Sequence, residues 1–186
     1  PLALVKAIDM DKNFKKYAED IMCSFNLGIT SLASEKKPIT TFFGEDDEEQ
    51  LKNLIKEVED APENALRLIS QQGNEIIVEK ENDKIWVRSL KIEHTGKKGK
   101  TVLFDLDEES DGTVRLLDFV PAFRDIISED RVYIIDEIER SIHPLLIKEL
   151  VKKFSLDTKT KGQLIFTTHE SNLLDQEIFR QDEIWF

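Results

Sequence analysis

Two adjacent carboxylates, Asp136 and Glu137, are the residues of this chain best suited to chemistry. They follow Val132–Ile135, a short run that is rich in β-branched residues and bounded by charge. Such a run is typical of a buried parallel strand, and ligands of parallel sheets bind at the carboxyl ends of the strands. There, the first acid can hold Mg²⁺ and the second can orient and deprotonate a water molecule. A strand followed by two solvated acids without a catalytic role explains this run alone equally well.

A second apolar run, residues 164–166, also ends in polar residues, Thr167, Thr168 and His169. If the two strands are neighbours in one sheet, His169 lies close to Asp136 and Glu137. An imidazole at this position could hydrogen-bond a γ-phosphate or the attacking water. A single histidine at a strand end is more often structural, so this role depends on the residues around it.

A third candidate is the start of a predicted helix over residues 113–127. Its apolar residues lie on one helical stripe: Leu116, Phe119, Val120, Phe123 and Ile127. The small polar residues from Ser110 to Thr113 then lie at the helix N-terminus, where free N–H groups and the helix dipole favour an anion. Gly112 would let the backbone approach a phosphate closely. An ordinary capped helix start is the alternative, and Pro121 is expected to kink the helix.

The segment after the acid pair carries further polar residues. Pro144 follows Arg140 and His143 and predicts the first turn of another helix. Taken singly, His143 is more often a capping residue and Arg140 more often an ion-pair partner than a ligand of phosphate.

Residues 94–101 resemble a phosphate-binding loop because they end in Gly-Lys-Thr. The loop motif requires Gly where His94 stands, and it must be followed by a helix. Here the chain continues as the strand-like run 101–104, so a Lys-rich hairpin turn is the better interpretation. The chain therefore contains no convincing Walker A motif.

In order and spacing, residues 109–113, 132–137, 139–144 and 167–169 together resemble the C-terminal half of an ABC-class ATPase. The chain is most similar to AAA-type ATPases of abortive-infection and anti-phage systems, which are related to the RecF, SMC and OLD ATPases. The resemblance covers residues 75–186 best. Asp111 and Thr113 depart from it, because they replace the Gly and Gln of the Leu-Ser-Gly-Gly-Gln signature, and Asp111 is expected to cap the helix instead.

The resemblance implies ATP and Mg²⁺ as cofactors and a role for each residue. Asp136 would be the Walker B ligand of Mg²⁺, Glu137 the catalytic glutamate and His169 the switch histidine. The nucleotide-contacting signature would contain Ser110, Gly112 and Thr113. Residues 139–143 would form the D-loop region of a head-to-tail homodimer that sandwiches ATP, with an effector protein or DNA as further partners.

Several elements must position these residues. The expected fold class is α/β: the C-terminal lobe of a P-loop NTPase, with a parallel sheet and flanking helices, joined to a helical segment and a small antiparallel β-meander. We expect a mostly helical arm over residues 1–73, the meander over 74–107 and the ATPase lobe over 108–186. Within these parts, helices are expected over 11–26, 45–63, 62–73 and 144–154, and strands over 132–136, 163–168 and 183–186.

Composition narrows the class of protein. The charged fraction is 34% and the hydrophobic fraction 40%, with no apolar stretch long enough to cross a bilayer and no secretory signal. The net charge of -12 argues against a large nucleic-acid-binding surface on this chain. A single cysteine, Cys23, fits a reducing compartment, so we expect a cytoplasmic protein without membrane partners. The chain begins at Pro1 and ends at Phe186 on a strand-like run, which suggests part of a longer protein.

Two other classes remain open. The fold could serve as a non-catalytic dimerisation or sensor module. A metal-dependent hydrolase could use Asp136, Glu137, His143 and His169 as ligands, although the usual pair of histidines on one helical face is missing.

Overall fold

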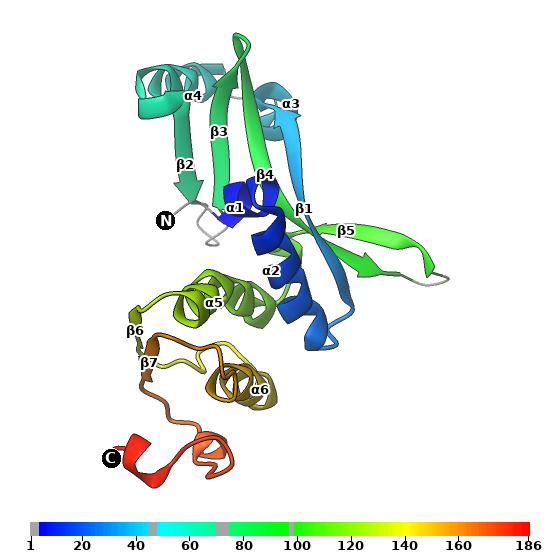
Figure 1. Ribbon diagram of the computed structural model, residues 1–186. Helices are drawn as coiled ribbons and strands as arrows, with labels where there is room; N and C mark the ends of the chain where they lie inside the picture. Colours follow the sequence, from blue (N-terminus) through cyan, green and yellow to red (C-terminus); the bar gives the residue numbers. More distant parts are fainter. Residues whose placement is uncertain (1–3, 45–47, 70–74, 97–98) are drawn as a thin grey trace. The chain divides into compact units, whose positions relative to one another are not determined.

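The structure, a computed structural model, describes residues 4–44, 48–69, 75–96 and 99–186. The chain divides into two compact units, residues 1–109 and residues 110–186 (Figure 1). Each unit combines helices with a sheet, which confirms the α/β class. Within the described ranges, no helix is both long and apolar enough to span a bilayer.

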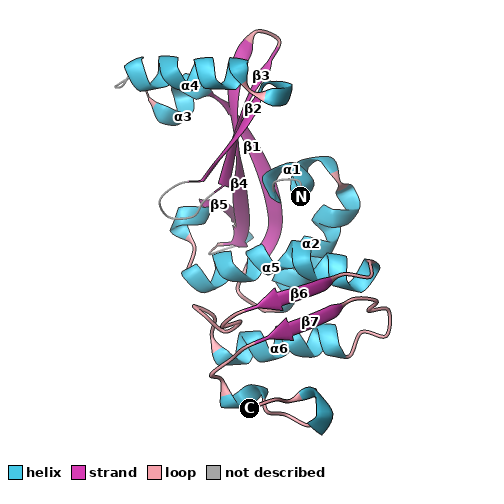
Figure 2. Ribbon diagram, turned by 90° about the vertical axis from the view of Figure 1, so that its left-hand side faces the viewer, coloured by secondary structure: helices cyan, strands magenta, loops and turns pink. Residues whose placement is uncertain are grey.

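The first unit is built on a five-stranded antiparallel sheet (Figure 2). Its strands are β1 (Ile29–Pro38), β2 (Ala65–Ile69), β3 (Glu75–Glu81), β4 (Lys84–Thr95) and β5 (Thr101–Asp105). The long strand β4 pairs with β1 along one edge, and with β3 and then β5 along the other. Val87 lies opposite Val78 of β3, and Ile92 lies opposite Phe104 of β5.

One face of this sheet is covered by α3 (Ile39–Phe43) and α4 (Glu48–Asp60). Val58 of α4 is fully buried against Val78 and Val87, and each such side chain contributes roughly 1.5–3 kcal/mol through removal from water. The amphipathic acidic helix expected over residues 45–63 is therefore confirmed as α4, whose apolar stripe faces the sheet. Residues 45–47 of that stretch lie outside the described residues.

The helices α1 (Leu4–Met10) and α2 (Lys12–Ser24) pack against β1. The helix predicted over 11–26 is confirmed as α2, and Asp11 caps it by accepting hydrogen bonds from the N–H groups of Asn13 and Phe14. The buried face of α2 carries Phe14, Ala18 and Met22.

The outer edge of β1 is partly blocked by a carboxylate from α2. Glu19 Oε1 accepts a hydrogen bond from the Leu32 N–H at 3.0 Å and another from the Ser31 hydroxyl at 2.9 Å. Because an edge strand presents unpaired N–H groups to other chains, this contact protects the sheet from edge-to-edge association.

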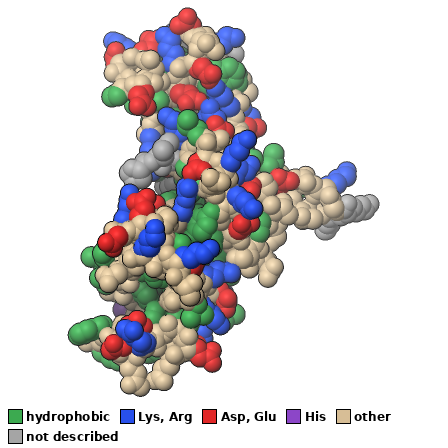
Figure 3. Space-filling model, viewed as in Figure 1, with side chains coloured by type: hydrophobic (Ala, Val, Ile, Leu, Met, Phe, Trp, Pro, Cys, Tyr) green, Lys and Arg blue, Asp and Glu red, His purple; other side chains and the backbone are tan. Residues whose placement is uncertain are grey.

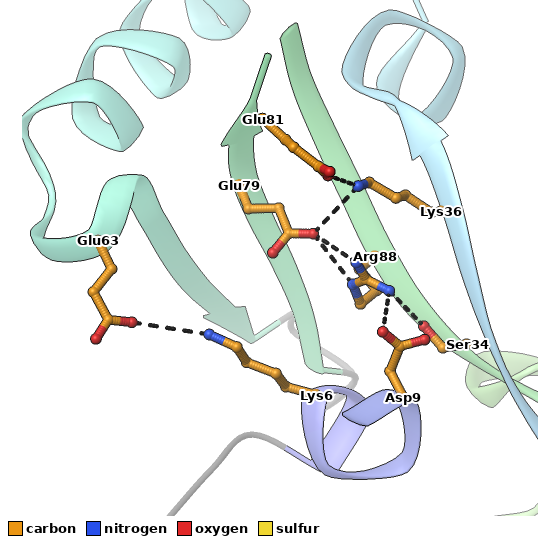
Figure 4. Close-up of polar contacts among 8 residues, drawn as sticks. All are labelled: Lys6, Asp9, Ser34, Lys36, Glu63, Glu79, Glu81 and Arg88. Carbon is orange, nitrogen blue, oxygen red and sulfur yellow. Dashed lines mark hydrogen bonds and ion pairs between the residues drawn. The ribbon is translucent and has the colours of Figure 1, made fainter. Parts of the chain in front are cut away.

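A charged network holds α1 to the sheet (Figure 4). Arg88 follows Val87 in β4 and so points to the face opposite α4. Its guanidinium binds Asp9 of α1 at 2.6 Å and Glu79 of β3 at 2.8 Å, and Lys36 of β1 approaches the same Glu79 at 3.8 Å (Figure 4). The Arg88 side chain is only 16% exposed, so these pairs are screened less than surface ion pairs.

The second unit has a two-stranded parallel sheet and two long helices. Its elements are α5 (Asp111–Ser128), β6 (Val132–Ile135), α6 (Pro144–Ser155) and β7 (Gln163–Phe166). Phe123 of α5 and Phe154 of α6 form an edge-to-face pair with ring centroids 5.6 Å apart. The sequence predicted all four elements, and each predicted boundary lies within two residues of the observed one. Pro121 lies inside α5, which continues through it as a single helix.

Several fold expectations need correction. The antiparallel meander expected over 74–107 corresponds to β3, β4 and β5, but β1 and β2 enlarge it to the main sheet of the first unit. Among the described residues, parallel pairing is limited to β6 and β7. Residues 1–73 are not a separate helical arm, because besides α1 to α4 they contain β1 and β2, which pair with β4 and β3.

The helix expected over 62–73 is instead a 3-10 turn, Pro62–Asn64, followed by β2. Glu63 has a φ of 60°, which interrupts a helix, and Leu66 and Leu68 alternate towards the core with the period of a strand. Gly73, the expected end of that helix, lies outside the described residues.

The strand expected over 183–186 is not formed. A 3-10 turn, Gln181–Glu183, is followed by irregular chain with Trp185 and Phe186 exposed. A strand needs a pairing partner, and the described residues offer none to this segment.

The hairpin interpretation of residues 94–101 is confirmed in part. Thr101 begins β5, whose Val102 lies opposite His94 of β4, so a strand and not a helix follows Gly99. Lys97 and Lys98 of the turn lie outside the described residues.

Candidate active site

The carboxyl ends of β6 and β7 bring the candidate catalytic residues together. The two strands are parallel neighbours, with Ile135 opposite Phe166, so both chains leave the sheet at the same edge. Asp136 and Glu137 follow β6, and Thr167 and His169 follow β7. The predicted neighbourhood of these two strands is therefore confirmed.

Thr167 links the two strand ends through its hydroxyl group. The hydroxyl donates a hydrogen bond to the Asp136 carboxylate and accepts one from the Glu137 N–H at 2.9 Å. The backbone adds two more contacts, from the Thr167 N–H to the Ile135 carbonyl at 3.0 Å and from the Ile138 N–H to the Thr167 carbonyl at 3.1 Å. The end of β7 therefore helps to hold Asp136 and Glu137, which follow β6.

Glu137 and His169 face each other at the edge of the sheet. His169 Nε2 lies 3.9 Å from Glu137 Oε1, and both side chains are exposed. Glu137 has a φ of 47°, in the left-handed region, which a non-glycine residue adopts only where surrounding contacts hold it. A carboxylate and an imidazole so close together could both contact a phosphate or a water bound beside them.

Glu139 holds the chain that carries His169. Glu139 Oε1 accepts a hydrogen bond from the His169 N–H at 2.9 Å, while Glu139 Oε2 is buried and has no hydrogen-bond partner within the part of the chain that the structure describes. Burial raises the pKa of the Glu139 carboxyl, but the His169 N–H and the Thr168 hydroxyl outweigh it and hold this pKa below its ordinary value.

The start of α5 is an N-capped helix. Ser110 Oγ accepts a hydrogen bond from the Thr113 N–H at 3.1 Å and lies 2.8 Å from the Thr113 hydroxyl oxygen. Ser110, and not Asp111 as expected, is therefore the N-cap. Thr113 is buried, so its side chain contributes to the helix start instead of facing solvent.

Gly112 has a packing role that its sequence context does not show. A Cβ atom at this position would lie 2.8 Å from the carbonyl oxygen of Ser141, which is too close for a side chain. The residue therefore lets the turn after the acid pair approach the start of α5. Ser141 itself has a φ of 64° within that turn.

His143 has the structural role that its type favours. It is the N-cap of α6, and its Nδ1 accepts a hydrogen bond from the Leu145 N–H at 3.3 Å. Across the described part of the chain, no three His, Cys, Asp or Glu side chains converge as metal ligands. The residues offered for a metal-dependent hydrolase thus form no such cluster.

A single carboxylate can still take part in magnesium binding. Mg²⁺ is commonly held by one or two carboxylates together with substrate phosphates and water. Asp136 is exposed at the strand end and oriented by Thr167, so this residue fits such a role.

Sequence reasoning missed the contacts of Thr167 and Glu139. Both residues stood inside recognised segments, but their partners are thirty positions away in the chain. The signal in the sequence that could have indicated these contacts is the polar residue that directly follows each of the two predicted parallel strands.

Residues 26–175 match the protein-family model described as "AAA domain, putative AbiEii toxin, Type IV TA system". The chain belongs to this AAA family. The match covers most of both units and includes Ser110, Asp136, Glu137 and His169. An AAA domain indicates the class of P-loop ATPases, whose members generally use nucleotide. No curated protein matches the chain significantly.

Proposed function

We propose that this chain is the C-terminal part of an ABC-type ATPase that binds and hydrolyses ATP with Mg²⁺ as a head-to-tail dimer. The observation that carries the proposal is the convergence of Asp136, Glu137 and His169 at the carboxyl ends of two parallel strands in a chain of the AAA family. Ligands of parallel sheets bind at this edge.

Each residue has a separate role in the proposed reaction. Asp136 takes part in holding Mg²⁺, and Glu137 orients and deprotonates the attacking water. His169, 3.9 Å from Glu137, contacts the γ-phosphate or the same water. Bound Mg²⁺ would neutralise the charge that develops on the phosphate oxygens.

Ser110, Gly112 and Thr113 belong to the signature segment, residues 110–113, which would contact ATP held by the other subunit. The N–H groups at the start of α5 and the positive end of its dipole suit an anion. Because Thr113 is buried and bonded to Ser110, we assign it to shaping this helix start, while Ser110 and Gly112 provide the contact.

The phosphate-binding loop is proposed to come from outside residues 1–186. The motif G-x-x-x-x-G-K-[ST] is absent from this sequence, and the Gly-Lys-Thr at residues 99–101 leads into β5. The β6–β7 pair also leaves Val132, Ile134 and Ile165 exposed. Parallel sheets are usually covered on both faces, so further elements against this pair would suit the proposal.

The biological setting is proposed from the family. Its description names an abortive-infection toxin, which supports a role in anti-phage defence, with an effector protein or DNA as the partner of the intact ATPase. A cytoplasmic location fits the single cysteine, Cys23, which is free.

The test is the substitution Glu137→Gln in a polypeptide that supplies the phosphate-binding loop. We expect the kcat for ATP hydrolysis to fall at least ~100-fold, because the amide cannot accept the proton of water. The KM for ATP should change little, since Glu137 acts on the water and not on the nucleotide.

Glu149→Gln is the matched control, because Glu149 is an exposed glutamate on α6 in the same unit. It should leave kcat unchanged. Full turnover by the Glu137→Gln variant would contradict the assigned base.

A non-catalytic dimerisation or sensor module is the second candidate. Asp111 at the signature supports it, because a carboxylate beside a phosphate weakens binding unless it points away. This function predicts a wild-type protein that dimerises with ATP, seen by light scattering, but releases no phosphate.

A further inference from the structure

We infer that Glu139 is a positioning residue whose carboxylate holds the backbone of His169 and so keeps the imidazole beside Glu137. This inference rests on the proposed function for its catalytic consequence. The hydrogen bond from the His169 N–H to Glu139 can be tested whether or not the protein hydrolyses ATP.

The segment that carries His169 has left the sheet. β7 ends at Phe166, and residues 167–170 form no regular structure. The Thr167 N–H still donates to the Ile135 carbonyl of β6, but the N–H groups of residues 168–170 need other partners. Glu139 Oε1 provides the partner for the His169 N–H at 2.9 Å. The imidazole itself is 86% exposed, so packing does little to hold it and its position depends on this backbone.

The Glu139 carboxylate is well placed to act as a fixed acceptor. The Thr168 hydroxyl, on the residue before His169, also helps to lower the pKa of this carboxyl. Its second oxygen is buried, with no hydrogen-bond partner among the described residues, so the carboxylate is shielded from solvent on that side. The lowered pKa of this carboxyl keeps it ionised near neutral pH, when its hydrogen bonds are strongest.

The turn that begins with Glu139 also reaches the signature segment. The Ile142 N–H donates to the Glu139 carbonyl at 2.9 Å, and the Ser141 carbonyl lies against Gly112 at the start of α5. Through its backbone, Glu139 is therefore connected to the signature segment, and through its side chain it is connected to His169. A shift of the signature segment on nucleotide binding would reach His169 by this route.

The experiment compares Glu139→Ala and Glu139→Gln in the full chain by NMR-detected amide exchange. Alanine removes the acceptor, and we expect the His169 amide to exchange roughly tenfold faster or more, since hydrogen bonds to charged groups are strong. The strand amides of Ile135 and Ile165 should keep their wild-type rates. Glutamine retains an acceptor oxygen and should restore most of the protection.

Glu149→Ala is the control for loss of a glutamate from the same unit, and it should leave the His169 amide unchanged. An unchanged rate in Glu139→Ala would overturn the inference. Equal acceleration at Ile135, Ile165 and His169 would also overturn it, because it would show general loosening of the unit.

A kinetic measurement tests the catalytic consequence in a polypeptide that supplies the phosphate-binding loop. We expect Glu139→Ala to lower kcat roughly tenfold with the KM for ATP nearly unchanged, and Glu139→Gln to recover most of kcat. A rise in KM with unchanged kcat would overturn the catalytic part. If the wild-type protein hydrolyses no ATP, the proposed function fails, while the exchange measurement still decides whether Glu139 positions His169.

Discussion

At the scale of single residues, the acid pair is organised by groups that have no direct part in the chemistry. Thr167 donates to Asp136 and accepts from the Glu137 N–H, and Glu139 binds the backbone of His169. A site built in this way depends on the threonine hydroxyl and the glutamate carboxylate as much as on the residues that would touch ATP. Supporting hydrogen bonds of this kind fix the orientation of reacting groups before the substrate arrives.

Thr167→Val tests this dependence, because valine has nearly the same shape but no hydroxyl. If the proposed function holds, we expect kcat for ATP hydrolysis to fall roughly 10-fold in a polypeptide that supplies the phosphate-binding loop. The free energy of unfolding should fall by about 1 kcal/mol, as the Glu137 N–H loses its acceptor. Steady-state kinetics and urea unfolding measure the two effects. Thr167→Ser should behave nearly as wild type, and Thr158→Val, at an exposed position, should change neither quantity.

At the scale of elements, ion pairs join three strands of the antiparallel sheet. Lys91 of β4 contacts Glu35 of β1 at 3.2 Å and also binds Asp105 of β5, which lies opposite it in the register. Burial raises the pKa of the Glu35 carboxyl, but the ammonium groups of Lys37 and Lys91 outweigh this effect and hold the pKa below its ordinary value.

The lowered pKa of Glu35 predicts a pH dependence of stability. A carboxyl whose pKa is lower in the folded than in the unfolded chain stabilises the fold above the unfolded value, about 4.3, and loses this effect as pH falls through the folded value. We expect Glu35→Gln to lower the free energy of unfolding by about 0.5 kcal/mol at pH 7, since the pair is partly exposed. The difference from wild type should shrink as the pH falls below the unfolded value and through the lowered pKa of the folded chain.

Urea unfolding at several pH values measures this difference. Glu93→Gln, on β4, is the comparison, because Glu93 carries no ion pair among the contacts found in the described residues. A Glu35→Gln effect that stays constant down to pH 2 would contradict the assignment.

At the scale of the whole molecule, charge limits what the chain can bind by itself. The net charge is -12, and on the face seen in Figure 3 the Lys and Arg side chains are interspersed with Asp and Glu. Binding of nucleic acid through phosphates needs a cluster of basic residues. If the proposed ATPase acts on DNA, we expect a partner to provide the contact and not residues 1–186 themselves.

The corresponding prediction concerns a labelled DNA duplex of 30 base pairs at about 0.15 M salt. We expect the 186-residue chain to bind it with a Kd weaker than about 10 µM, as measured by fluorescence anisotropy, because few phosphates can be neutralised. Submicromolar binding that weakens steeply with salt would contradict this prediction, because it would show that a local basic surface is enough to bind DNA.

The sequence by itself determined the elements whose signals are local. Helical and strand periodicity can be recognised from residues that are close in sequence. The sequence therefore predicted the apolar stripe of α5, the start of α6 at Pro144 and the apolar runs of β6 and β7. The same local signals marked Asp136, Glu137 and His169 as candidates and, with their spacing, indicated an ATPase family. They also distinguished the Gly-Lys-Thr hairpin from a phosphate-binding loop.

Only the tertiary structure decided which segments pair and which groups hold the site. Residues 65–69 became a strand because β3 lies beside them, and residues 183–186 did not because no described strand does. The bonds from Thr167 to Glu137 and from Glu139 to His169 each span thirty residues. Local periodicity carries no information about contacts at that separation, since they arise only when the fold brings the two strand ends together.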